Sequence, residues 1–138
     1  MTVRHVTKRT ICAINQLSIE MTGGVVADPR NNFRQGQGLG FVDRIAANEA
    51  FGHALYEDVF HQAAAYLFYI VKNHVFEDGN KRTGLATAVL FLELNEIALA
   101  PFNENAVFDR ISNIAAGTQN AGVAIPDMAR WLRRNSLY

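Results

Sequence analysis

Nearly every position in one short turn offers a chemically useful group. In chain order these residues are His74, Phe76, Glu77, Asp78, Gly79, Asn80, Lys81 and Arg82. Connections between helices usually need only a few solvating residues. The two cations fall in the expected first turn of the next helix, where the helix dipole disfavours each by about a few tenths of a kcal/mol. An anion would remove that cost, because the N–H groups of a helix start, a lysine and an arginine together form a phosphate site.

Each of these residues also has an ordinary structural role. His74 suits the last carbonyls of the preceding helix, Asp78 or Asn80 suits an N-cap, and Gly79 tolerates a positive φ angle. Together these roles leave the two cations unexplained. They also leave an aromatic residue, Phe76, in a polar turn, so we expect it to point inward and anchor the loop to the core.

Taken together, the side chains favour transfer of a phosphoryl or nucleotidyl group to a hydroxyl. The donor of this group would be a nucleoside triphosphate, which carries Mg²⁺. Asp78 is the candidate ligand of this ion, and Glu77 is the weaker alternative. Residues 79–82 would supply N–H donors and positive charge for the phosphates. His74 is the candidate base for the acceptor hydroxyl, because histidine changes its charge near neutral pH.

Two apolar segments must hold this turn. A helix predicted over residues 57–73 is apolar around most of its circumference, and an almost wholly apolar helix follows over 83–95, so both are expected at the centre. Further helices are predicted over residues 7–22, 42–53 and 103–117, with a last one opening at Pro126. In the first of these, the predicted buried face consists of Ile11, Ile14, Leu17, Ser18 and Met21. Since no strand pattern competes, the predicted fold class is all-α, with a loop or short hairpin between residues 23 and 40.

Length and composition restrict the possibilities further. With 138 residues, 49% hydrophobic and 19% charged, residues 1–138 are expected to form one compact domain. A formal net charge of zero gives no electrostatic reason to expect nucleic acid as a partner. No apolar run is long enough for a membrane span. The single cysteine, Cys12, excludes an internal disulfide and is expected to be inert; with no signal-peptide pattern, a cytoplasmic setting is expected.

At this point the turn resembles the motif of the Fic/Doc (Fido) family. The general pattern is His-x-Phe-x-Asp/Glu-Gly-Asn-Gly-Arg-x-x-Arg, and six of its positions match here: His74, Phe76, Asp78, Gly79, Asn80 and Arg82. Two positions depart from the pattern. Lys81 stands where Fic adenylyltransferases have glycine, and Leu85 stands where they have the second arginine, which grips the terminal phosphates. The Doc branch shares the Asn-Lys-Arg ending, although its type member has alanine at the position of Gly79.

The resemblance implies a function. Doc-type toxins bind ATP in the reverse orientation and transfer its γ-phosphate, acting as protein kinases on translation elongation factor Tu and arresting growth. It implies His74 as the base, Asp78 as the Mg²⁺ ligand, and residues 79–82 as phosphate ligands. A flap that docks the target as an added strand would lie within residues 31–41. Its candidate residues are Asn32, Phe33, Arg34 and Gly36.

Restraint of a toxic activity is expected from another chain. The inhibitory helix of many Fic proteins has the pattern Ser/Thr-x-x-x-Glu-Gly/Asn, and no serine or threonine here has glutamate four residues on. The resemblance implies a Phd-like antitoxin whose segment folds into an apolar groove on the toxin.

Three alternatives remain open at this level. The first is a Fic-type adenylyltransferase despite the two departures, and the second is a catalytically silent Fido domain that binds a partner or nucleotide. The third is a metal-dependent hydrolase that uses His5, His53, His61 and His74, although His53 and His61 show no metal spacing with a carboxylate.

Overall fold

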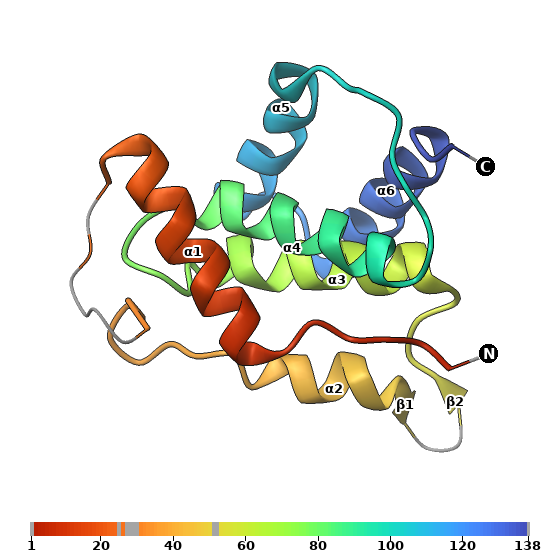
Figure 1. Cartoon of the computed structure of the whole chain (residues 1–138). Coiled ribbons are helices and arrows are strands. Elements are labelled where there is room, and N and C mark those ends of the chain that lie inside the picture. The colour runs from red at the N-terminus through yellow and green to blue at the C-terminus, as the bar shows by residue number, and fades with distance from the viewer. Residues whose placement is uncertain (1, 25, 27–30, 51–52, 138) are drawn as a thin grey trace.

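The protein is a bundle of helices around a central antiparallel pair (Figure 1). This computed structural model describes residues 2–24, 26, 31–50 and 53–137. The described helices are α1 (Lys8–Thr22), α2 (Phe41–Ala47), α3 (Val59–Lys72), α4 (Asn80–Leu94), α5 (Glu104–Ala115) and α6 (Ala121–Arg134). The two short strands, β1 (Glu49–Ala50) and β2 (His53–Ala54), pair antiparallel. The all-α prediction is confirmed.

Helices α3 and α4 form the centre, and the other helices pack around them. Helix α1 packs on α4, while α6 and α2 pack on α3. The pair approaches closely at Gly84 of α4, where an added Cβ would lie 2.9 Å from Cγ2 of Val71 and 3.3 Å from the Leu67 carbonyl oxygen. Helix α3 is buried around most of its surface, as predicted, because it has neighbours on several sides.

The first helix has the predicted bounds but a different buried face. Thr7 caps its start and Gly23 ends it at φ +73°. The buried residues are Ile11, Asn15 and Ile19. Leu17 and Met21, which the sequence placed in the core, are 57% and 76% exposed. The prediction was wrong because it excluded polar Asn15, whose amide finds hydrogen-bond partners inside the molecule.

Three other predicted boundaries were wrong. Helix α2 ends at Ala47 because Asn48 adopts the left-handed conformation, and the chain continues into the β1–β2 hairpin. Helix α4 begins at Asn80, three residues earlier than expected. Pro126 lies inside α6 rather than at its start, because the Asn120 side chain caps the helix by accepting from the Val123 N–H.

The structure also bears on the cysteine and on the possibility of a membrane span. Cys12 is half-buried, and this burial raises the pKa of its thiol, which disfavours the reactive thiolate. Among the helices of the described residues, none combines the length and the apolar character needed to cross a membrane.

The close approach of α3 and α4 yields a prediction about stability. Gly84→Ala should lower the free energy of unfolding by about 1–3 kcal/mol, because the new methyl overlaps Val71 despite the better helix propensity of alanine. Urea unfolding would measure it. Gly40→Ala is the matched control, since Gly40 has a helical φ of −57° and open space around its Cβ position. Equal stabilities of the two variants would contradict the close contact.

Candidate functional site

The motif turn forms a short loop between α3 and α4, and the interior residues of this loop are buried. Val75 and Phe76 are fully enclosed, and Phe76 is 1% exposed. The Phe76 ring lies 5.5 Å from the ring of Phe33, centroid to centroid. Phe76 therefore occupies the inward position that a loop anchor requires, while the polar residues around it stay accessible.

The side chain of Asn80 clamps the loop from the start of α4. Its Oδ1 accepts a hydrogen bond from the Phe76 N–H at 2.9 Å, and its Nδ2 donates to the Phe76 carbonyl at 2.8 Å. Both ends of this amide are thus used within the loop. A phosphate contact from Asn80 would come from its backbone N–H, since the first N–H groups of a helix lack partners within that helix.

A second amide, Asn15 of α1, ties three segments together beneath the loop. Its Nδ2 donates to the Asp78 carbonyl at 2.8 Å and to the Thr83 hydroxyl at 3.1 Å. Its Oδ1 accepts from Nδ2 of Asn32 at 3.4 Å. All three side chains are completely buried. Neither Asn15 nor Thr83 was predicted from the sequence, although an asparagine midway between Ile11 and Ile19 on one helix face was a usable signal.

The predicted flap, residues 31–41, lies beside the loop. The Glu77 N–H donates to the Asn32 carbonyl at 3.0 Å, and the Arg34 N–H donates to the Val75 carbonyl at 2.9 Å. Phe33 and Phe76 form an isolated antiparallel bridge between these contacts. The flap is therefore a loop, and the hairpin of the described chain lies after α2 instead. Gly36 is exposed and has a φ of +80°.

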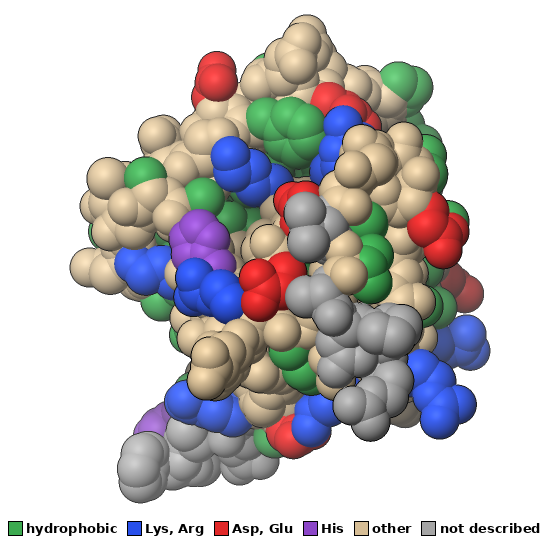
Figure 2. Space-filling view, turned by 90° about the vertical axis from the view of Figure 1, so that its left-hand side faces the viewer, with side chains coloured by type: hydrophobic (Ala, Val, Ile, Leu, Met, Phe, Trp, Pro, Cys, Tyr) green, Lys and Arg blue, Asp and Glu red, His purple; other side chains and the backbone are tan. Residues whose placement is uncertain are grey.

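The polar residues of the loop border an open pocket of about 550 Å³. Acidic, basic and histidine side chains gather on this face of the molecule (Figure 2). The pocket lining consists of Thr22, Val71, His74, Glu77, Asp78, Gly79, Asn80, Lys81, Arg82, Phe108 and Ala115. It thus brings together the predicted base, carboxylates and cations. The flap residues do not line it.

Helix α5 holds the predicted base in one tautomer. Nε2 of His74 lies 3.0 Å from the Ala115 carbonyl oxygen, in the last residue of α5. Because a carbonyl oxygen can only accept, Nε2 carries the proton in the neutral ring and Nδ1 is the nitrogen that can accept one. His74 itself has a φ of +47°, which is unusual for a residue with a side chain. No sequence signal pointed to Ala115, since the contact uses its backbone.

The other half of the pocket suits an anion. Gly79 caps α4 in the left-handed conformation, at φ +75°, without a side-chain cap. Lys81 and Arg82 follow, exposed in the first turn of the helix, where its N–H groups and dipole also favour negative charge. The Arg82 guanidinium carbon lies 6.0 Å from the centre of the Phe108 ring.

Of the two acidic residues that line the pocket, Asp78 is the better placed to hold a metal ion. Its Oδ1 accepts from the Gly79 N–H at 2.8 Å. The backbone just after α1 lies close to its Oδ2, because a Cβ added at Gly24 would lie 2.6 Å from that oxygen. Glu77 also lines the pocket but is exposed. Mg²⁺ usually takes one or two protein carboxylates together with substrate phosphates and waters, which this donor set fits.

The histidines do not form a shared metal site. His5 pairs with the Tyr66 hydroxyl at 3.1 Å, His61 pairs with Asp58 at 2.8 Å, and His74 binds the carbonyl of Ala115. Within residues that the structure describes, no three His, Cys, Asp or Glu side chains are grouped to hold a metal ion. The arrangement gives no support to a histidine-based hydrolase.

The buried amide of Asn15 yields a prediction about the site. Asn15→Ala should lower the free energy of unfolding by about 1–3 kcal/mol, because it removes the partner of buried polar groups. The loop should also lose order, visible as faster hydrogen exchange at Asp78 and Gly79. Asn105→Ala, on the exposed surface of α5, is the control and should change stability by less than about 0.5 kcal/mol. Unaltered exchange in the Asn15 variant would show that the loop holds its shape without this amide.

Comparison with known proteins identifies the family. The model of the Fic/DOC family matches residues 5–92, more than half of the chain. "Protein kinase doc" of Escherichia phage P1 is 28% identical over 136 residues, which cover 96% of this chain and 95% of that protein. The matched family region contains α1, the flap, the motif loop and most of α4, and the similarity to the phage protein extends through α5 and α6. This chain belongs to the Fic/DOC family.

Proposed function

We propose that this protein is a Doc-type protein kinase, which transfers the γ-phosphate of ATP to a hydroxyl of a target protein. The observation that carries the proposal is the pocket in which His74 faces the cationic first turn of α4. At the position of the second Fic arginine, Leu85 is buried and offers no charge to a phosphate. The name of the phage relative, a protein kinase, agrees with this reading.

The chain's own residues suggest how the transfer would run. Nδ1 of His74 would take the proton of the target hydroxyl while the hydroxyl oxygen forms a bond to the γ-phosphorus. The bond between that phosphorus and the bridging oxygen would break, and ADP would leave. The N–H groups at the start of α4, with Lys81 and Arg82, would hold the phosphates and stabilise the charge that develops on them. Asp78 would hold Mg²⁺, which offsets phosphate charge when bound.

The target is proposed to dock along the flap. Asn32 and Arg34 already use backbone groups to pair with the motif loop, so an added strand would use other backbone groups of the flap, around Phe33 and Gly36. We propose translation elongation factor Tu as the target, so that transfer arrests translation in the cytoplasm. A Phd-like antitoxin would restrain this toxin in trans. Membership of the Fic/DOC family and the similarity to the phage protein support this proposal.

A transfer assay with two labels tests the reaction. Purified protein, Mg²⁺ and elongation factor Tu would be incubated with ATP labelled at either the γ- or the α-phosphate, and label on the target would be counted. We expect transfer from the γ position alone. His74→Ala should reduce the rate by about 10²–10⁴-fold while the fold, checked by circular dichroism, is retained. Label from the α position would make the protein an adenylyltransferase, and a fully active His74 variant would remove the base assignment.

The two residues that depart from the Fic pattern can be replaced by the residues of that pattern. Lys81→Gly combined with Leu85→Arg should shift the label on the target from γ towards α, because an arginine one turn into α4 can hold the terminal phosphates. The single variants separate the two positions. Since Leu85 is buried, thermal unfolding of each variant must accompany the assay. An unchanged label in the folded double variant would show that these positions do not set nucleotide orientation.

A further inference from the structure

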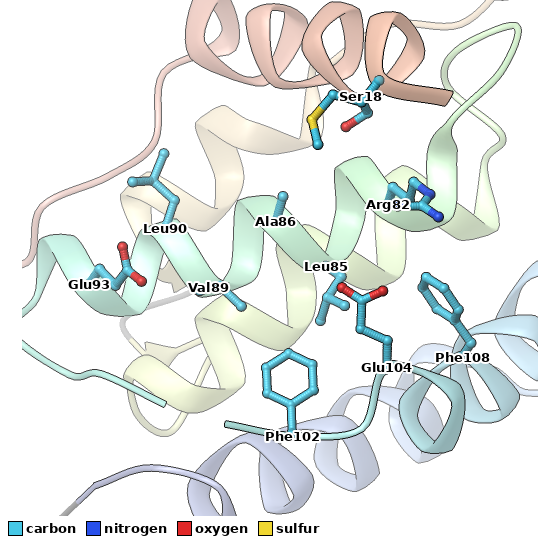
Figure 3. A pocket seen from close by; sticks show the side chains of 11 residues that line it. Ser18, Arg82, Leu85, Ala86, Val89, Leu90, Glu93, Phe102, Glu104 and Phe108 are labelled. Atoms are coloured by element: carbon cyan, nitrogen blue, oxygen red, sulfur yellow. The ribbon is translucent and has the colours of Figure 1, made fainter. Parts of the chain in front are cut away.

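A third cavity lies away from the motif loop, between α2, α3 and α6. Its volume is about 300 Å³. The motif pocket and the cavity beside Leu85, whose side chains Figure 3 shows, share Arg82 and Phe108. None of the residues that line the third cavity lines either of those two. We call it the α6 cavity, and any ligand that it binds is separate from the nucleotide of the proposed kinase.

Hydrogen-bond donors line the part of this cavity that α2 and α3 contribute, together with the segment between them. They are the side chains of Arg44, Tyr56, His61 and Tyr69. Arg44 is exposed in the last turn of α2, and its guanidinium can present two parallel N–H groups to one ligand. Among the described residues that line the cavity, none is acidic. An anion would therefore meet a cation and several donors here.

The two tyrosines keep one hydroxyl proton for a ligand. Their side chains are hydrogen-bonded to each other, and burial, followed by this contact with Tyr69, raises the pKa of Tyr56 to about 12. The Tyr56 phenol therefore stays protonated at neutral pH. When one hydroxyl donates to another, the accepting hydroxyl still has its own proton to donate. The ring of Phe41 lies 5.5 Å from that of Tyr69, centroid to centroid, and supports it from α2.

The carboxylates nearest to His61 have other surroundings. Nδ1 of His61 lies 2.8 Å from Oδ1 of Asp58, whose second oxygen pairs with Arg133. Because a carboxylate accepts, Nδ1 carries a proton and Nε2 is the nitrogen left for a ligand. Glu57 is 82% exposed, with its Oε2 3.9 Å from this Nε2. Since neither acid lines the cavity, Arg44 is the charge that a ligand meets there.

The remaining side chains of the α6 cavity are apolar. They belong to Leu55, Ala121, Ile125 and Pro126. The ring of Pro126, which the sequence placed at a helix start, lies inside α6 and forms part of this wall. Small-molecule sites have volumes from about 300 Å³ upwards and are mostly apolar, with a few polar groups that orient the ligand. The cavity therefore suits a small molecule that has an apolar body and one anionic end.

We propose that the α6 cavity binds a small organic carboxylate with a flat, apolar body. Arg44 would hold the carboxylate through paired N–H groups, and the free tyrosine hydroxyl would donate to the same group. The body would lie between the rings of Tyr69 and Pro126. A single guanidinium neutralises a carboxylate, whereas a phosphate group carries about −1.5 to −2 charges at neutral pH and would keep part of its charge.

Titration with 3-phenylpropionate, followed by NMR of the full chain, tests the proposal. We expect a dissociation constant of about 1 mM or lower, a value within reach of a ligand of this size. Backbone amide signals of Arg44, His61 and Tyr69 should shift, and those of residues 74–82 should not. 3-Phenylpropanamide has the same shape without the charge, so it should bind at least about tenfold more weakly.

Matched variants separate the charge from the rest of the cavity. Arg44→Gln should weaken the binding of 3-phenylpropionate at least about tenfold, and it should fold normally because Arg44 is exposed. Arg9→Gln removes the same charge from the exposed surface of α1, outside the cavity, and should leave the affinity unchanged. Tyr69→Phe keeps the ring but removes a hydroxyl, and should weaken binding about threefold or more.

Several outcomes would overturn the carboxylate site. They are no binding at about 10 mM, where even a weak ligand of this size should saturate, equal affinities for the acid and the amide, and an Arg44 variant that binds like the unchanged protein. Shifts confined to residues 74–82 would place the acid in the motif pocket and have the same consequence. Tighter binding of inorganic phosphate, seen at the Arg44 signal, would assign the cavity to phosphate instead. None of these results depends on whether γ-label reaches elongation factor Tu.

Discussion

Two asparagine side chains hold the motif loop in place, and the pocket depends on both. Asn80 binds the N–H and the carbonyl of Phe76, and Asn15 binds the carbonyl of Asp78 from the neighbouring helix. Hydrogen bonds of this kind are modest in net energy, but buried groups left without partners are costly. The observed loop satisfies these amides and carbonyls, and it also exposes His74 and Asp78 to the same cavity.

The close packing of α3 and α4 fixes the positions of the two helix ends that this loop connects. Gly84 allows the two helices to approach, and Gly79 allows the chain to enter α4 through a left-handed conformation. As a result, the first turn of α4 points its N–H groups, Lys81 and Arg82 into the pocket. The charge pattern that looked unfavourable in an isolated helix becomes favourable once a phosphate is present.

The end of α5 also contacts the site, although this helix lies outside the residues that the family model matches. Its carbonyl at Ala115 fixes the proton on Nε2 of His74, which leaves Nδ1 for chemistry. Phe108 of the same helix lines the motif pocket and also a second cavity that borders α1 and α4. The same helix thus contacts His74 at its end and lines a second cavity with Phe108.

Much of this site was predictable because its residues are contiguous. Residues 74–82 form one turn, so their order and types alone indicated a base, a carboxylate and a phosphate cradle, and the apolar segments on either side indicated central helices. The contacts that position these residues were not predictable from local pattern. Asn15, Asn32 and the Ala115 carbonyl are far from the turn in sequence, and they meet it only because the helices pack around α3 and α4. Periodicity likewise misplaced Leu17 and Met21 in the core, since burial of Asn15 depends on partners that other segments supply. The residue types of the motif are therefore set by the local sequence, whereas the tautomer of His74 and the hydrogen bonds that hold the loop arise from long-range packing.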